Sequence, residues 1–310
     1  MKIFTITLNP AFDIHCNIEN LQLHKENYAT SVTRYAGGKG INISRALCGV
    51  GINNTAICAL GTSGGEEFLA TLKKDGLCCR TIVTEGRIRE NITVHSQNGE
   101  TRISFEGFNI NKEMIDKVYA MIQEQRQENM IVTFTGRLCD GITKDDAKEL
   151  LLKIKEIGAK VIVDCNSFTK ADLLNIKPFL IKPNEQEISQ LLGEEIKESE
   201  QALKAAKSLC DGGIENVIIS LGAKGFVFWG RNGGYCIEVP QIVPVSTIGA
   251  GDSLIAGFTA GMARGENITE TLKLAAAFGT AACLTEGTNP PKKEVIAELI
   301  GKIVCSKCVL

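Results

Sequence analysis

The stretch Val245-Ser-Thr-Ile-Gly-Ala-Gly-Asp252 joins a polar loop to a run of small and apolar residues that continues to Arg264. Its small residues Gly249, Ala250 and Gly251 allow the backbone to turn tightly and to approach a ligand closely. The apolar residues that follow recur at helical spacing, which predicts a helix from about Ala250. Because a helix start carries unpaired N–H groups and the positive end of the helix dipole, it is suited to bind an anion.

Asp252 lies in the first turn of that predicted helix, beside the same positive end. A carboxylate there stays ionised and can accept a proton from a hydroxyl group. An anion site next to a base is what the transfer of a phosphoryl group to a hydroxyl requires. An aspartate at this position would also be expected if it only stabilised the helix start. The rest of the chain has to decide between the two interpretations.

Length, composition and charge restrict the class of protein. The 310 residues fit one main domain with a smaller accessory element, and 44% hydrophobic with 23% charged residues is typical of a soluble globular protein. A net charge of −2 gives no electrostatic signature of nucleic-acid binding. No apolar run approaches the roughly 20 residues of a membrane span, and the opening lacks the layout of a signal peptide. We expect a cytoplasmic protein that binds neither nucleic acid nor membrane.

The cysteines and histidines do not suggest a metal site. The twelve cysteines are scattered, mostly within apolar runs, where a reduced thiol acts as a small hydrophobic group. Cys305 and Cys308 form a Cys-x-x-Cys pair without a second pair nearby, whereas a structural zinc site needs four ligands. The three histidines are not spaced as metal ligands. We expect chemistry that uses neither zinc nor a reactive thiolate.

Two further motifs lie near the N-terminus. The glycine cluster Ala36-Gly-Gly-Lys-Gly-Ile-Asn42 opens a predicted helix and matches neither the P-loop nor the dinucleotide-binding pattern. It offers backbone N–H groups to a second anion, and Lys39 adds a point charge. Asp13 follows the turn Asn9-Pro10 at the end of a predicted strand. Ligands lie beyond the carboxyl ends of strands in open parallel sheets, so Asp13 is placed to meet substrate hydroxyls. Position alone nevertheless favours the alternative that Asp13 is an ordinary aspartate of a surface turn.

Strand and helix patterns alternate along the chain, which predicts a mostly parallel central sheet covered by helices on both faces. We expect one α/β domain over residues 1–310. Strands are predicted at 2–8, 55–60, 80–83, 131–135, 161–164, 179–181 and 217–220, and helices at 66–74, 111–128, 143–157, 185–192 and 198–211.

A smaller sheet is predicted outside the main one. The turn Asn98-Gly99 separates two alternating runs, which is a strong hairpin signal. With the segment 14–35, read as irregular, this hairpin would form a discontinuous β lid from about 14–35 and 88–106. Lids exclude water from phosphoryl transfer, and their exposed faces often dimerise, so we expect a homodimer through the lid. A second hairpin, Phe226–Trp229 with Tyr235–Val239, is expected at the edge of the main sheet.

Asn184 and Glu187 start the helix predicted at 185–192. An amide oxygen and a carboxylate at this spacing share one face and suit Mg²⁺ bound largely through water. The same pair would also serve as an ordinary N-cap with an acid in the first turn.

Over essentially its whole length, the chain resembles the PfkB (ribokinase-like) family of carbohydrate kinases. The resemblance rests on five motifs in family order: Thr7-Leu-Asn-Pro-Ala-Phe-Asp13, Gly37-Gly-Lys-Gly-Ile-Asn42, Lys182-Pro-Asn-Glu-Gln-Glu187, Ser220-Leu-Gly-Ala-Lys-Gly225 and Ser246-Thr-Ile-Gly-Ala-Gly-Asp252. The opening motif is similar to the hexose-phosphate branch, 1-phosphofructokinase and tagatose-6-phosphate kinase. The resemblance implies a ribokinase-like fold and an enzyme that uses ATP and Mg²⁺ to phosphorylate a ketohexose phosphate, foremost fructose 1-phosphate.

The resemblance also implies a role for each motif residue. Asp252 would be the base, with Gly249, Ala250 and Gly251 as the anion hole. The sugar phosphate would be bound by Asp13, Gly38, Lys39, Asn42, Arg89, Asn91 and Arg137. ATP would be bound by Lys182, Asn184, Ser220, Gly222, Gly225 and Asn289. Mg²⁺ would be organised, largely through water, by Asn184 and Glu187.

One departure from the branch concerns the acceptor. Thr135-Gly-Arg-Leu-Cys139 stands where the branch usually has Ser-Gly-Ser-Leu-Pro, so an expected serine near the sugar phosphate is Arg137. Tagatose-6-phosphate kinase, or a PfkB kinase of another sugar, therefore stays an alternative. A non-catalytic sugar-phosphate sensor is a third reading, against which the intact base argues. A nicotinamide-dependent oxidoreductase would need the Gly-x-Gly-x-x-Gly pattern that this chain lacks.

Overall fold

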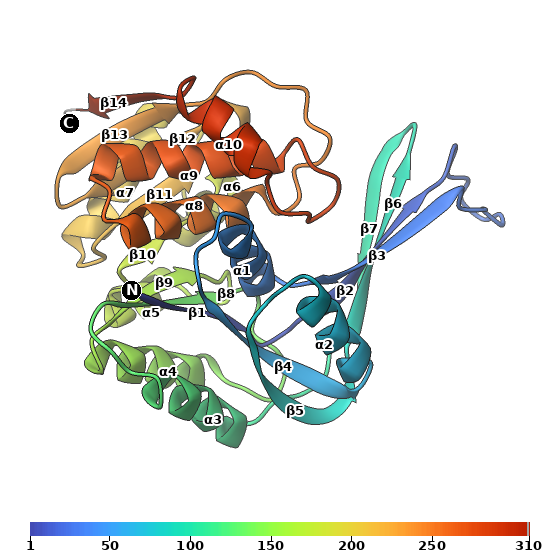
Figure 1. The fold of residues 1–310 in the computed structure, drawn as a ribbon. Coiled ribbons are helices and arrows are strands. Elements are labelled where there is room, and N and C mark those ends of the chain that lie inside the picture. Colours follow the sequence, from blue (N-terminus) through green and yellow to red (C-terminus); the bar gives the residue numbers. More distant parts are fainter. Residues whose placement is uncertain (309) are drawn as a thin grey trace.

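The computed structural model describes residues 1–308 and 310, and Figure 1 shows a large layered body from which a smaller sheet projects. The main sheet has ten strands. From one edge to the other they are β14 (Val304–Cys308), β13 (Gly233–Glu238), β12 (Phe226–Gly230), β11 (Val217–Ser220), β10 (Leu180–Ile181), β9 (Ala159–Asp164), β8 (Met130–Thr135), β1 (Lys2–Thr7), β4 (Thr55–Ser63) and β5 (Cys79–Arg87). The strands from β11 to β5 are parallel, which confirms the predicted fold class.

Helices cover both faces of the main sheet (Figure 1). One face carries α1 (Lys39–Gly49), α8 (Ala250–Arg264), α9 (Ile268–Ala282) and α10 (Lys293–Ile300). The other carries α2 (Gly65–Lys74), α3 (Lys112–Gln123), α4 (Lys144–Glu156), α5 (Lys170–Ile176), α6 (Glu185–Leu192) and α7 (Ser199–Asp211). Successive strand residues serve opposite faces: Ile131 packs with the first group and Val132 with the second. Buried on both faces, these strands form the core.

The smaller sheet, here called the lid sheet, comprises β3 (Ser31–Gly37), β2 (Ala11–Asn17), β6 (Arg89–Ser96) and β7 (Gly99–Ser104), in that order. The hairpin at Asn98-Gly99 is confirmed as β6 and β7. The irregular interpretation of segment 14–35 is wrong for residues 14–17 and 31–35, because β2 and β3 pair from Ala11–Gly37 to Asn17–Ser31, whereas residues 18–30 between them form no strand or helix. The alternation of apolar and polar residues along β2 was an available strand signal. Phe12 packs against Phe68 of α2 from the apolar face, with ring centroids 5.1 Å apart.

The C-terminal segment corrects a second expectation. The hairpin of β12 and β13 forms as predicted, but it is not the edge of the sheet. β14 adds outside β13, in a register that pairs Cys308 with Gly234 and Val304 with Glu238. Cys305 and Cys308 thus belong to an edge strand. All twelve cysteines are free thiols, and among the described residues no group of three His, Cys, Asp or Glu side chains is arranged to hold a metal ion.

Within the described part of the chain, no helix combines the length and the apolar character that crossing a membrane requires.

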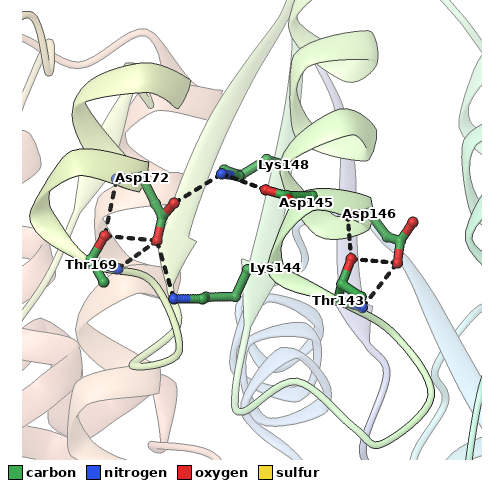
Figure 2. A network of polar contacts seen from close by, with 7 residues as sticks. All are labelled: Thr143, Lys144, Asp145, Asp146, Lys148, Thr169 and Asp172. Carbon is green, nitrogen blue, oxygen red and sulfur yellow. Dashed lines mark hydrogen bonds and ion pairs between the residues drawn. The ribbon is translucent and has the colours of Figure 1, made fainter.

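A network of polar contacts fastens the start of α5 to α4 (Figure 2). Thr143 with Asp146, and Thr169 with Asp172, form capping boxes at the starts of the two helices. Lys148 of α4 reaches across to Asp172, with Nζ 3.0 Å from Oδ1. Partial burial opposes the charge of Asp172, but the Thr169 N–H group and Lys148 outweigh it and lower its pKa to about 2. The network therefore fixes the loop that leads from β9 and Asp164 into α5.

Candidate active site

A cavity of about 490 Å³ lies between the main sheet and the lid sheet. Its lining includes residues at or just beyond the carboxyl ends of three neighbouring parallel strands, Thr7 of β1, Thr135 of β8 and Asp164 of β9. The starts of α1 and α8 add Lys39 and Asp252. This is where parallel α/β sheets place their ligands. The predicted residues that line the cavity are Asp13, Gly38, Lys39, Asn42, Arg89, Asn91, Arg137, Lys182, Asn184, Glu187, Gly249, Gly251 and Asp252.

Asp252 lies in the first turn of α8 and is only 6% exposed. Asn42 of α1 donates a hydrogen bond from Nδ2 to Oδ2 of Asp252 over 2.9 Å. Burial raises the pKa of Asp252 to about 6, although the nearby charge of Lys39 acts in the opposite direction. The carboxylate is thus mostly ionised at neutral pH, yet close enough to its pKa to take up a proton readily.

Asp164 lies between two lysines beside Asp252. Lys39 Nζ is 2.8 Å from Oδ2 of Asp164, and Lys182 Nζ is 3.6 Å from Oδ1. Burial disfavours the charge of Asp164, but both lysines outweigh it and hold its pKa below the ordinary value. Burial likewise opposes the charge of Lys39, and Asp164 and Asp252 outweigh it and raise its pKa. Two lysine side chains therefore lie near the start of α8.

The backbone at the start of α8 leaves room for a ligand. Gly249 is the N-cap residue and has a φ of 81°, a left-handed conformation that glycine adopts without strain. Lys182 Nζ would lie 3.0 Å from a Cβ at Gly251, so this amine sits against the helix start. Thr7 and Thr288 line the same cavity, and each has a buried Oγ1 without a hydrogen-bond partner among the described residues. These hydroxyls are available to a bound molecule.

A second group of lining residues, none of which is among the charges that act on Asp252, forms the arginine end of the cavity: Arg89 of β6, Arg102 of β7 and Arg137 after β8. Arg102 Nη2 is 3.0 Å from Oδ1 of Asp13, and Asn91 Nδ2 donates to the same oxygen over 2.9 Å. Burial lowers the pKa of Arg89; Asp13 opposes that shift, while Arg137 and Arg102 add to it. The Nε of Arg89 is buried without a hydrogen-bond partner among the described residues. Crowded cations with an unused donor are suited to a dianion.

Arg102 and Asp164 were not assigned a role from the sequence. Arg102 was overlooked because an arginine in an exposed hairpin is usually solvated. Its inward direction follows only from the register that sets it opposite Thr93 of β6, in the strand that also carries Arg89 and Asn91. Asp164 ends a buried strand, and that position was the available signal, since carboxyl ends of parallel strands gather ligand-binding residues.

Asn184 and Glu187 form a capping box at the start of α6. Asn184 Oδ1 accepts from the Glu187 N–H group over 2.8 Å, and Glu187 Oε2 accepts from the Asn184 N–H group over 2.9 Å. The ordinary N-cap interpretation thus describes these two contacts. Glu187 also faces Lys39, whose pKa it helps to raise. Its second carboxylate oxygen has no hydrogen bond to another described residue and remains available at the cavity wall.

The residues predicted to bind the nucleotide lie along the neighbouring strand ends. The Ser220 N–H group donates to the Pro183 carbonyl over 3.0 Å, which brings the end of β11 next to Asn184. Gly222, with a φ of 58°, faces open space, because a Cβ there would meet nothing within 4 Å. Asn289 is exposed and directly follows Thr288. Ser220, Gly222, Gly225 and Asn289 do not line the cavity itself, but adjoin it through Asn184 and Thr288.

A sequence profile of the pfkB family of carbohydrate kinases matches residues 7–295. The chain belongs to this family. It is 32% identical to 1-phosphofructokinase of Borreliella burgdorferi over 91% of this chain and 92% of that one. It is 29% identical to 1-phosphofructokinase of Bacillus subtilis, over 96% of this chain and 98% of that one. Phosphofructokinase-2 of Escherichia coli, in a crystal structure with substrates and products, superposes with a TM-score of 0.90 at 25% identity, covering 97% and 99% of the two chains. The expected family, ribokinase-like fold and enzyme class are thereby confirmed.

Proposed function

We propose that this PfkB kinase transfers the γ-phosphoryl group of ATP to fructose 1-phosphate and so forms fructose 1,6-bisphosphate. The observation that carries the proposal is the polarity of one cavity. A buried carboxylate at a helix start lies at one end, and three guanidinium groups lie at the other. A ketohexose phosphate has matching polarity, with a reactive hydroxyl at one end and a phosphate at the other. Relatives named 1-phosphofructokinase support this acceptor.

At the helix start, Asp252 takes the proton of the acceptor hydroxyl as its oxygen attacks the γ-phosphorus. The bond from that phosphorus to the bridging oxygen of ATP breaks, and ADP leaves with the electron pair. The predicted anion hole of Gly249, Ala250 and Gly251 lies at the positive end of α8, where N–H groups would face the charge on the transferred group. The Ala250 N–H group donates to the Thr247 carbonyl over 3.4 Å, so it would have to leave that contact to take part. Lys39 was predicted to hold the sugar's own phosphate. Its position between Asp164 and Asp252 favours a contact with the transferred phosphoryl group instead.

At the arginine end, Arg89, Arg102 and Arg137 hold the phosphate already on the sugar. Arginine binds a phosphate with two parallel hydrogen bonds, which also fixes its orientation. Four further residues at the wall are proposed to hold the sugar hydroxyls: Asp13, Gly38, Asn42 and Asn91. A substrate held at both ends presents one hydroxyl to Asp252.

We propose that ATP lies along the ends of β10 and β11, against Lys182, Asn184, Ser220, Gly222, Gly225 and Asn289. The open space at Gly222 and the adjacent cavity wall support this path. Glu187 fits a water-mediated Mg²⁺ site, because its unused carboxylate oxygen lies at the cavity wall. Asn184 Oδ1 is engaged in the helix cap, so Asn184 would act through water. When bound, Mg²⁺ neutralises phosphate charge on the nucleotide.

We further propose a homodimer through the outer face of the lid sheet. Val32 and Ile103 are 59% and 49% exposed there, and the sheet projects from the body (Figure 1). Apolar side chains on such a face favour a protein contact. The double variant Val32→Lys with Ile103→Lys is expected to halve the mass measured by light scattering. An unchanged dimer mass would contradict a lid-mediated contact, and a monomeric wild type would contradict the dimer itself.

The deciding experiment measures ADP release from Mg-ATP with fructose 1-phosphate, tagatose 6-phosphate, fructose 6-phosphate, fructose and ribose. We expect the highest kcat/KM with fructose 1-phosphate. Highest turnover of tagatose 6-phosphate would select the neighbouring enzyme. Activity confined to the free sugars would show that the arginines do not bind a substrate phosphate.

A further inference from the structure

Three side chains on the inner face of the lid sheet form a hydrogen-bonded chain that the proposed reaction does not use. Glu100 of β7 places Oε1 3.0 Å from Nδ1 of His95 in β6. His95 Nε2 lies 2.9 Å from Nδ1 of His15 in β2. The two imidazole rings are nearly parallel, with centroids 5.2 Å apart and an interplanar angle of 12°, so they meet edge to edge through this hydrogen bond. The chain thus runs from the edge of the lid sheet to its interior.

The order of these groups fixes where their protons lie. An ionised Glu100 can only accept, so a neutral His95 carries its proton on Nδ1 and donates it to Glu100. His95 Nε2 is then an acceptor, which requires His15 to donate from its own Nδ1. His15 Nε2 consequently carries no proton. The chain presents a lone pair at its inner end.

That lone pair is buried and unused. His15 is 6% exposed, and its Nε2 has no hydrogen-bond partner among the described residues. His15 Nε2 faces Gly287. A Cβ built at Gly287 would lie 3.5 Å from this nitrogen and 3.1 Å from Cε2 of Tyr35. A buried polar atom without a partner destabilises the protein. Such a cost at a specific place suggests that the atom has a partner in another state of the protein.

The segment at Gly287 connects His15 to the active site. Thr288 follows Gly287, lines the cavity and has a second unpartnered polar atom, its buried Oγ1. Thr288 Cγ2 would lie 3.9 Å from a Cβ at Gly249, the N-cap residue of α8. The lid histidine and the helix start therefore lie on opposite sides of the same short segment.

We propose that His15 is a positioning residue whose Nε2 accepts a hydrogen bond from the Gly287–Thr288 segment when substrates are bound. This bond holds Thr288 against the start of α8, where the phosphoryl group is transferred. Glu100 and His95 keep His15 in the form that can accept. The kinetic part of this inference rests on the proposed function, whereas the position of the protons does not.

Acid is expected to release this contact. One proton added to the histidine pair lets His95 Nε2 donate to His15 Nδ1, so His15 Nε2 must itself carry a proton and can no longer accept. The charged groups that face His15 are His95, Glu100, Asp13 and Arg102. The Tyr35 ring packs edge-on against it, and Glu286 on the neighbouring segment is exposed.

Nuclear magnetic resonance of the ring nitrogens tests the proton positions directly. The chain has three histidines, and His24, in the exposed loop between β2 and β3, serves as an internal control. At pH 8, we expect His15 and His95 to carry the proton on Nδ1. Fructose 1-phosphate with a non-hydrolysable ATP analogue should shift the Nε2 resonance of His15 and leave that of His24 unchanged. A proton on Nε2 of His15, or an unchanged resonance at saturation, would overturn the proposal.

Kinetics test the consequence. His15→Phe keeps a ring but removes the acceptor, and we expect kcat to fall roughly 10-fold, the effect of one hydrogen bond, while KM for ATP changes less than about twofold. The acid limb of log(kcat/KM) should be steeper in the wild type than in the variant, because protonation of His15 Nε2 adds to that of Asp252 only in the wild type. His24→Phe should match the wild type. An unchanged slope in an active His15→Phe enzyme would refute the proposal, whereas a wild type inactive on all phosphosugars would refute the proposed function.

Glu100→Gln is a milder variant that tests the proposal even if His15→Phe does not fold. Glu100 is about half exposed, so Glu100→Gln is expected to fold normally. The amide can donate as well as accept, which lets His95 and His15 adopt the opposite proton arrangement. We expect the Nε2–H form of His15 to become detectable and kcat to fall about threefold, less than the loss of a whole hydrogen bond. An unaltered proton position on His15 would show that Glu100 does not direct the chain.

Discussion

The two ends of the cavity are built differently. At the helix end, Asp252, Asn42 and Lys39 come from α8 and α1 in the body, and Asp252 is almost completely buried. At the arginine end, Arg89 and Arg102 come from the lid sheet, and Arg102 is 43% exposed. A buried carboxylate with a raised pKa is suited to move a proton, whereas clustered guanidinium groups are suited to capture an anion. We therefore expect changes at the helix end to lower kcat and changes at the arginine end to raise KM.

The largest effect should follow from Asp252→Asn, which removes the base and keeps the shape of the side chain. General-base catalysis contributes about 10²- to 10⁴-fold, and we expect kcat to fall by that factor while ATP binding persists. ADP release and nucleotide titration measure the two quantities. In the wild type, activity should fall as pH drops through about 6, where Asp252 becomes protonated. A fall in kcat of less than tenfold would assign the base to another residue.

The arginine end is tested by Arg137→Ser, which restores the serine usual in the hexose-phosphate branch. A hydrogen bond to a charged group contributes about 1.5–3 kcal/mol, so KM for the sugar phosphate should rise about 10- to 100-fold. KM for ATP should change less than twofold. The matched control is Arg87→Gln, a 70% exposed arginine of β5 that pairs with Glu90 and is not part of the cavity wall. Unchanged acceptor kinetics would remove Arg137 from the site.

The same contrast explains what could be read from the sequence. The motif at 249–252 could be interpreted from the sequence because a helix start is formed by consecutive residues. The glycines, the helix dipole and Asp252 are neighbours in the chain. The arginine end could be predicted only in part from the sequence. Arg102 meets Asp13 across 89 residues, through a register of β2, β6 and β7 that one sequence does not reveal. The His15–His95–Glu100 chain depends on the same register, and both were missed for that reason.

The edge strand β14 was missed for a different physical reason. Its side chains are mostly half-buried or exposed, so it lacks the apolar run that marks β8 or β9. Its pairing with β13 is made by the backbone, which any sequence can offer. The raised pKa of Asp252 was not foreseen either, because burial under α1 is a tertiary effect, whereas the helix dipole alone predicts a low value.

Lys39→Gln tests the helix end by changing the pKa of Asp252. Burial has the largest effect on the pKa of Asp252 and raises it. The charge of Lys39 has the second largest effect and lowers that pKa. Removing that charge should move the acid limb of kcat/KM to a pH above 6. Lys182→Gln is the matched variant and should cause a smaller shift, since Lys182 acts more weakly on Asp252. Equal shifts in both variants, or none, would contradict the ranking of the two lysines.

The same Asp252→Asn variant should also change stability, and in the favourable direction. Because the pKa of Asp252 is raised from 3.8 to about 6, the folded state binds its proton more tightly than the unfolded state does. The resulting stabilisation is complete below pH 3.8 and is lost as pH rises through about 6. At pH 7 the ionised, buried carboxylate therefore costs about 3 kcal/mol, which asparagine avoids.

Thermal unfolding of wild type and Asp252→Asn at pH 7 and pH 4 measures this cost. The variant should have the higher Tm at pH 7, and the difference should shrink at pH 4, where the native aspartate is protonated. Asp172→Asn provides the opposite case, because the capping contacts in Figure 2 lower the pKa of Asp172 to about 2. That variant should lose stability at pH 7 and lose less of it in acid. If both substitutions lowered Tm at pH 7 alike, the carboxylate of Asp252 would be contributing to the fold. The expected contrast between Asp252, whose burial opposes its charge, and Asp172, whose capping contacts favour its charge, would then be wrong.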